Sequence, residues 1–201
     1  VRNKNFRLVA GKPLYRHLLD KLKNSNFDEI HVDSDSTEIE KYCKNNGFNF
    51  IKRKKKLLKD SANGNDLLNY HTKIINAEYY FQLFVTAPLL SISTINSCIK
   101  LLEKKKNIDS ILTVKEIYSW FWFKKKPINY NPKLLPRSQD ASPIIQETTG
   151  LYGIKKHALN KYKCRIGNKP LFYKIDDFES IDLDTEWDFK ILNRMIKKNK
   201  L

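Results

Sequence analysis

The chain has 201 residues, of which 41% are hydrophobic and 12% aromatic, and its formal net charge is +16. This length and apolar content indicate one folded α/β-sized domain with a substantial core, and they exclude a largely disordered chain. Three widely spaced cysteines, without a C-x-x-C pair, argue against a disulfide or zinc framework and favour a reducing, cytoplasmic location. No apolar run approaches the roughly 18 residues that a membrane helix needs.

The positive charge suits nucleic acid or small polyanions such as nucleoside triphosphates. Much of the excess lies in three short runs, at 53–56, 104–106 and 124–126. Because the basic residues are dispersed and the aromatic residues are not spaced as a stacking platform, nucleic acid is the less favoured partner. A non-catalytic basic protein that binds nucleic acid or an acidic glycan stays an alternative.

The apolar pattern predicts alternating helices and strands through the first half of the chain. In order, we expect a helix over 13–24, a strand over 28–33, a helix over 36–46 ending at Gly47, a strand over 48–52, a helix after Asp66 to about 77, a strand over 78–86, a helix from Ser91 or Ser93 to about 104, and a strand over 109–114. The strand at 78–86 is the most apolar, as a central buried strand should be. This alternation predicts an α/β fold with a mainly parallel sheet covered on both faces.

Residues 118–146 break that pattern. Four consecutive aromatic residues, 120–123, precede four prolines within twenty residues. A long irregular segment in a compact domain is usually functional or interfacial, and aromatic crowding often marks a subunit contact, so we expect a dimer contact here. Core packing plus a long loop is the alternative. Regular structure should resume with a strand over 151–154, a helix over 156–162, a strand over 171–175 and a helix over 186–198.

Two carboxylates, Asp182 and Asp184, stand two residues apart in an Ile/Leu frame. In an extended segment such residues project from one face, and paired hard oxygen ligands suit Mg²⁺. Thr185 and Asp188 have the spacing of a capping box, so the alternative is that both aspartates belong merely to a helix start.

Four polar segments, at 2–12, 34–36, 86–88 and 181–184, follow expected strands or turns. In open α/β sheets, ligands bind beyond the carboxyl ends of the strands. A basic loop, a hydroxyl-bearing turn and a carboxylate pair are what metal-assisted phosphoryl or nucleotidyl transfer requires, because such transfer depends mainly on positioning and charge neutralisation.

Six segments, in order and at similar spacing, resemble motifs of the CMP-sugar synthetases, the cytidylyltransferases that activate sialic acid and related acidic sugars. The segments are K-N-F-R-L with G-K-P-L at 4–14, V-D-S-D at 32–35, the lysine-rich loop at 53–60, F-V-T-A-P-L at 84–89, R-S-Q-D at 137–140 and S-I-D-L-D-T at 180–185. Each motif alone is weak, and six in sequence are a specific signal.

This resemblance implies a three-layer α/β/α Rossmann-like nucleotidyltransferase fold over residues 1–201, with 118–146 as a dimerisation insertion of a homodimer. It implies conversion of CTP and an acidic 2-keto-3-deoxy sugar, such as a nonulosonic acid, to a CMP-sugar and pyrophosphate. It also implies that Asp182 and Asp184 bind Mg²⁺ and that Lys4 and Asn5 contact the nucleotide, with the charge of Lys4 directed at phosphate. Thr86, Ala87 and Pro88 would form the cytidine pocket. Arg137 and Gln139 would contact the sugar, often across the dimer interface.

Several positions depart from the family pattern. A first strand and a Gly/Ser-rich phosphate loop would precede Val1, so we expect either an N-terminal segment before residue 1 or a pseudoenzyme. Ala87, Leu90 and Gln146 replace a serine and two arginines of the family. The segment 86–90 resembles the pseudaminic- and legionaminic-type branch, and the Lys4-Asn5 pair disfavours the alternative, a 3-deoxy-manno-octulosonate-type enzyme.

Overall fold

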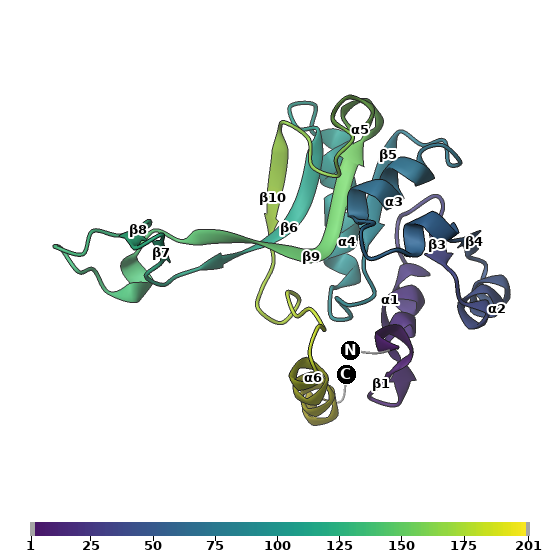
Figure 1. Cartoon of the computed structure of the whole chain (residues 1–201), viewed down its shortest axis with the longest axis horizontal. Helices are drawn as coiled ribbons and strands as arrows, with labels where there is room; N and C mark the ends of the chain where they lie inside the picture. Colours follow the sequence, from purple (N-terminus) through teal and green to yellow (C-terminus); the bar gives the residue numbers. More distant parts are fainter. Residues whose placement is uncertain (1–2, 200–201) are drawn as a thin grey trace.

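A four-stranded mixed sheet forms the centre of the computed structural model, which describes residues 3–199 (Figure 1). Its strands lie in the order β10 (Pro170–Lys174), β6 (Ser110–Ile117), β9 (Ile144–Lys155) and β5 (Tyr79–Leu83). β10 and β6 are parallel, whereas β9 is antiparallel to both β6 and β5. The expectation of a mainly parallel sheet is therefore wrong. β9 returns directly from β6 without a crossover helix, and such a connection makes neighbouring strands antiparallel.

A separate parallel pair, β3 (His31–Ser34) and β4 (Asn49–Lys52), is joined by α2 (Thr37–Asn46) in a β–α–β unit. The ends of α2 confirm the expected helix. The Ser36 side chain accepts hydrogen bonds from the backbone N–H groups of Glu38 and Ile39, and Gly47 ends the helix at φ 74°. Only glycine adopts that left-handed conformation without steric cost, which is why the helix ends there.

Apolar clusters lie on opposite sides of β5, because neighbouring residues of a strand point to opposite faces. Phe81 packs with the cluster formed largely by α1 (Leu14–Leu22) and α4 (Ile92–Lys104), whereas Tyr80 packs with α3 (Gly64–His71) and α5 (Lys156–Tyr162). α3 ends six residues before the expected boundary, where the N–H groups of Ile74 and Ile75 both bond to the carbonyl of His71 and form a turn.

A third cluster joins the two ends of the chain. The N-terminal segment contains a 3₁₀ turn, Lys4–Phe6, and a short hairpin of β1 (Leu8–Val9) and β2 (Lys12–Pro13). The last helix, α6 (Glu186–Asn199), packs against it. The cluster's buried residues are Val9, Leu14, Leu183, Phe189, Leu192 and Ile196. Within residues 3–199, no helix is both long and apolar enough to span a bilayer.

The expected irregular segment is an arm. β6 and β9 remain paired from Val114–Glu147 to Ile117–Ile144, and the chain between them leads away from the sheets to a small hairpin of β7 (Trp122–Phe123) and β8 (Lys126–Pro127) (Figure 1). Its large apolar side chains are exposed, as Tyr118, Trp120, Trp122, Phe123, Ile128, Leu134 and Leu135 show. Packing of the aromatic block into the core of its own chain is therefore wrong.

The packing of β5, β9 and β6 yields a prediction. A Cβ on Gly153 of β9 would lie 2.5 Å from Phe81 Cε1 and 2.8 Å from Ile111 Cγ2. We expect Gly153→Ala to lower the free energy of unfolding by about 1–3 kcal/mol, the usual cost of overpacking. Gly150→Ala is the matched control, because its new methyl group would meet no atom closer than 3.5 Å. Urea unfolding followed by circular dichroism measures both, and equal effects would contradict this packing.

Candidate active site

Leu183 fixes the segment that carries the two candidate aspartates. Its side chain is fully buried, and its backbone N–H donates to the carbonyl of Thr86 at 2.9 Å. Asp182 and Asp184, on either side of it, lie outside the buried cluster. The structure thus brings two of the four polar segments, the turn after β5 and the carboxylate pair, next to each other.

Asp182 has one satisfied and one unsatisfied carboxylate oxygen. Thr149 of β9 donates its hydroxyl to Asp182 Oδ2 at 2.7 Å, whereas Oδ1 is buried and has no hydrogen-bond partner among the described residues. Leaving a buried carboxylate oxygen unpaired costs free energy, so such an atom calls for a ligand. Thr149 was missed by the sequence analysis, because no motif marks it and its position depends on the register of β9.

Asp184 is paired with a residue from the other end of the chain. Lys4 Nζ lies 2.8 Å from Asp184 Oδ1, with 25% of the lysine side chain and 68% of the aspartate side chain exposed. An ion pair this exposed contributes little to the stability of the fold. Its consequence is that the charge of Lys4 lies beside Asp184. Asn5 is exposed beside Lys4.

The N-terminal segment is held against α6 by further contacts. Arg7 Nη1 lies 2.5 Å from Glu186 Oε1, and its guanidinium lies 4.3 Å from the centre of the Phe189 ring. The backbone N–H of Ala10 donates to Asn193 Oδ1 at 2.7 Å. Together these contacts place Lys4 at the start of α6.

The start of α6 is a capping box, as predicted, but neither candidate aspartate's carboxylate takes part in it. Asp188 Oδ2 accepts from the N–H groups of Thr185 and Asp184, at 2.6 and 3.0 Å, while Thr185 Oγ1 accepts from the N–H of Asp188 at 3.3 Å. Burial alone would raise the pKa of Asp188, but these hydrogen bonds hold it below its ordinary value. The carboxylates of Asp182 and Asp184 are thereby left to other partners.

The turn after β5 contains the residues expected at the cytidine. Ala87 is buried, and the carbonyl oxygen of Pro88 accepts a hydrogen bond from Lys21 Nζ at 2.5 Å. The carbonyl of Leu90 accepts from the same ammonium at 2.8 Å. Lys21 lies in α1 and was not singled out from the sequence, since nothing in a helical pattern tells which distant loop a side chain reaches.

Arg137 and Gln139 are not part of this site within one chain. Both lie in a 3₁₀ turn region of the arm, where Arg137 Nε and Nη2 bond to Asp140 at 2.7 and 3.3 Å. The arm leads away from the loop that precedes α6 (Figure 1). Although it pairs with Asp140, the Arg137 side chain is 74% exposed.

The fit to a metal ion rests on two carboxylates. Within residues 3–199, no group of three or more His, Cys, Asp or Glu side chains could hold a metal ion. Asp182 and Asp184 with the unpaired Oδ1 match the case of Mg²⁺, which takes one or two carboxylates and completes its shell with water and phosphate oxygens.

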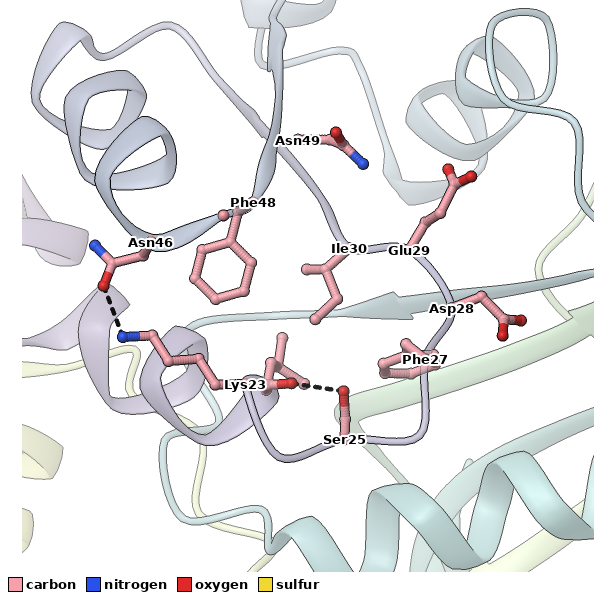
Figure 2. Close-up of a pocket in the computed structure, with 11 residues that line it drawn as sticks. Lys23, Ser25, Phe27, Asp28, Glu29, Ile30, Asn46, Phe48 and Asn49 are labelled. Atoms are coloured by element: carbon pink, nitrogen blue, oxygen red, sulfur yellow. Dashed lines mark hydrogen bonds between the residues drawn. The ribbon is translucent and has the colours of Figure 1, made fainter.

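A separate hollow of about 270 Å³ lies where the end of α1, residues 25–30 and the α2–β4 junction meet (Figure 2). None of the predicted site residues lines it. It lies beside the residues that begin β3 and β4, whereas ligands of α/β sheets bind beyond the opposite, carboxyl ends of the strands. We therefore do not assign the substrate to this hollow.

Comparison with known proteins gives a family match over residues 1–173, to the family described as Cytidylyltransferase. N-acylneuraminate cytidylyltransferase A of Danio rerio is 24% identical over 96% of this chain and 47% of its own length. Post-translational flagellin modification protein B of Campylobacter coli is 25% identical over 100% of this chain and 91% of its own length. The chain spans about half the length of the N-acylneuraminate cytidylyltransferases that it matches.

Among solved structures, CMP:2-keto-3-deoxy-manno-octonic acid synthetase complexed with CTP is similar to this chain with a TM-score of 0.72 and 14% identity. The match covers 99% of this chain and 93% of that one. At this identity the likeness shows a shared α/β fold.

The capping box at α6 yields a second prediction. Asp188→Ala should lower the free energy of unfolding by about 1 kcal/mol at pH 7, the usual value of a helix cap. Because the pKa of Asp188 is held below 3.8 in the folded chain, this stabilisation is present above that pH and is lost as pH falls through the lower folded value. Urea unfolding from pH 7 down to about pH 3 tests this. Glu186→Ala, which breaks only an exposed pair, should have a much smaller effect, and equal effects would contradict the cap.

Proposed function

The chain belongs to the cytidylyltransferase family, and on this premise we propose that it transfers a cytidylyl group from CTP to an acidic 2-keto-3-deoxy sugar, giving a CMP-sugar and pyrophosphate. The observation that carries the proposal is the meeting of three distant segments, Lys4, Thr86 and Asp182–Asp184, through the Lys4–Asp184 pair and the Leu183–Thr86 hydrogen bond. A nonulosonic acid of the sialic acid type is the proposed sugar, because N-acylneuraminate cytidylyltransferases are among the relatives.

In the proposed reaction, the anomeric hydroxyl of the sugar attacks the α-phosphorus of CTP. The new O–P bond forms as the bond between the α-phosphorus and the oxygen that bridges to the β-phosphate breaks. Pyrophosphate leaves with that oxygen, and the hydroxyl proton passes to solvent water. The contribution of the protein is positioning and charge neutralisation. Lys4 would exchange Asp184 for a phosphate oxygen, Asn5 would hydrogen-bond the nucleotide, and Thr86, Ala87 and Pro88 would line the cytidine.

Asp182 and Asp184 would hold Mg²⁺, which when bound supplies charge neutralisation where the triphosphate meets the acidic sugar. The unpaired Oδ1 of Asp182 supports this role, since a cation would satisfy it. Thr149 keeps the other oxygen of Asp182 oriented through its 2.7 Å hydrogen bond. Orientation by such a partner is common for carboxylates that bind metals.

The arm would join two copies in a homodimer, so that the three-layer, Rossmann-like domain carries residues 118–146 as a dimerisation insertion. Its exposed aromatic side chains, such as Trp122 at 57% and Phe123 at 62%, support this, because large exposed apolar patches usually mark interfaces. Arg137 and Gln139 would then reach the sugar in the site of the other copy. An acidic sugar suits the guanidinium of Arg137, which can bind a carboxylate through two hydrogen bonds.

The direct test is pyrophosphate release by the full-length protein with CTP, Mg²⁺ and a panel of acidic 2-keto-3-deoxy sugars. We expect release with CTP and with at least one nine-carbon acidic sugar, and little with UTP or ATP. A preference for 3-deoxy-manno-octulosonate would change the sugar and keep the reaction. Absence of release with every sugar, together with retention on heparin or DNA that falls as salt rises, would favour a binding protein instead.

The carboxylate pair gives a third prediction. Asp184→Ala should lower kcat/KM for CTP at least a hundredfold, on the order of the loss when a charge-stabilising group is removed, while the protein stays folded. Asp177→Ala is the matched control, because Asp177 is 94% exposed in the same loop and pairs only loosely, at 3.6 Å, with Lys115. Near wild-type turnover by Asp184→Ala would contradict its assignment.

The arm gives a fourth prediction. Asp184→Ala and Arg137→Ala should each be nearly inactive alone, yet mixing them should recover activity, because a mixed dimer has one site with both residues intact. Random exchange of two subunits in equal amounts restores about a quarter of the wild-type sites. The activity of mixtures after co-refolding or co-expression measures this. Failure to recover any activity would show that Arg137 does not act across the interface.

A further inference from the structure

Lys21 bridges α1 and the turn after β5. Its half-buried ammonium donates to two backbone carbonyl oxygens, those of Pro88 at 2.5 Å and Leu90 at 2.8 Å. A carboxylate would be the usual partner of a buried lysine, because removing an ammonium from water is costly. Here the charge is instead directed at the peptide groups of a turn, and charge-assisted hydrogen bonds of this kind are stronger than neutral ones.

Glu179 makes a further contact at the end of the same turn. Its Oε2 accepts a hydrogen bond from the backbone N–H of Ser91 at 3.2 Å. Glu179 lies three residues before Asp182, in the loop whose Leu183 N–H bonds to the Thr86 carbonyl. Two hydrogen bonds therefore join the turn to the carboxylate loop at residues 86 and 91, and Lys21 fixes the carbonyls that lie between them.

We propose that Lys21 is a positioning residue of the candidate active site, which holds the Thr86–Leu90 turn in register with Asp182 and Asp184. This inference rests on the proposed function, in which the turn lines the cytidine and the carboxylates act at the phosphates. Both parts of CTP must then be held at a fixed separation, and displacements of about 1 Å can lower rates a hundredfold. In this proposal Lys21 acts through the turn, by its hydrogen bonds to the carbonyl oxygens of Pro88 and Leu90.

The charges around Lys21 make the contact sensitive to pH. Burial lowers the pKa of Lys21 to about 8, Glu179 from the carboxylate loop opposes this shift, and Lys12 of β2 adds to it. Burial, with Lys12 and Lys21 nearby, lowers the pKa of His17, one turn earlier on α1. Above about pH 8 the ammonium becomes an amine, and both its attraction to Glu179 and the charge assistance to the carbonyls are lost.

The effects on stability and on positioning have opposite signs. The pKa of Lys21 in the folded chain is below its ordinary value of 10.5, so the buried charge opposes folding below about pH 8. That penalty is relieved as pH rises from about 8 towards 10.5. If kcat/KM for CTP falls above pH 8, deprotonation of Lys21 would not have lowered the stability of the fold. The pH dependence therefore distinguishes a loss of positioning from unfolding.

The test compares Lys21→Met with Lys23→Met. Lys23 is near the end of the same helix, but it donates to Asn46 at 2.6 Å and lies at the hollow, as Figure 2 shows. We expect Lys21→Met to raise KM for CTP about tenfold or more, to lose the decline above pH 8 and to speed amide hydrogen exchange at Leu183 and Ser91. Lys23→Met should change none of these by more than about twofold.

An unchanged KM or unchanged exchange in Lys21→Met would overturn the proposal. If Lys21→Met does not fold, the wild-type protein still decides, because kcat/KM that stays flat from pH 7 to 9.5 contradicts the proposal, whereas a decline with unchanged thermal stability supports it. If the wild-type protein does not use CTP at all, the proposed function fails. Exchange at Leu183 and Ser91 would then show separately whether Lys21 holds the turn.

Discussion

One backbone hydrogen bond, from Leu183 N–H to Thr86 O, joins the two halves of the candidate site. It can do so because the Leu183 side chain is completely buried among residues from both ends of the chain, including Val9 and Phe189. Burying a leucine contributes about 1.5–3 kcal/mol, far more than any exposed ion pair around it. Burial of the Leu183 side chain therefore sets the position of Asp182 and Asp184. The polar contacts then orient their carboxylates.

The two carboxylates beside this anchor lack a full set of hydrogen-bond partners. Among residues 3–199, Asp182 keeps one buried oxygen without a partner, Asp184 forms an ion pair with the partly buried Lys4, and the helix start is capped by Asp188. Proteins usually satisfy buried polar atoms fully, and local exceptions tend to lie at functional sites. The exception here lies where the long-range contacts of Lys4 and Thr86 with the carboxylate loop also meet.

The sequence was informative where structure is local. The caps of α2 at Ser36 and Gly47, and the Thr185–Asp188 capping box, follow from residue types at fixed offsets. Long-range arrangement was harder to predict. Alternation of apolar residues does not give strand direction, so the antiparallel course of β9 was missed, and with it Thr149. Apolar composition also does not distinguish a buried aromatic block from an exposed arm. The contact of Lys21 with Pro88, 67 residues away, could not be predicted from the helical pattern around Lys21.

β9 runs from the base of the arm at Ile144 through Thr149 to its last residue, Lys155. Its pairing with β6 shifts register between Leu112 and Val114, next to the stretch that contains Thr149. One of the two strands at the base of the arm is thus the strand whose Thr149 orients Asp182. If binding at the arm and binding at the carboxylates are coupled through this strand, thermodynamic reciprocity requires that each changes the affinity for the other by the same factor.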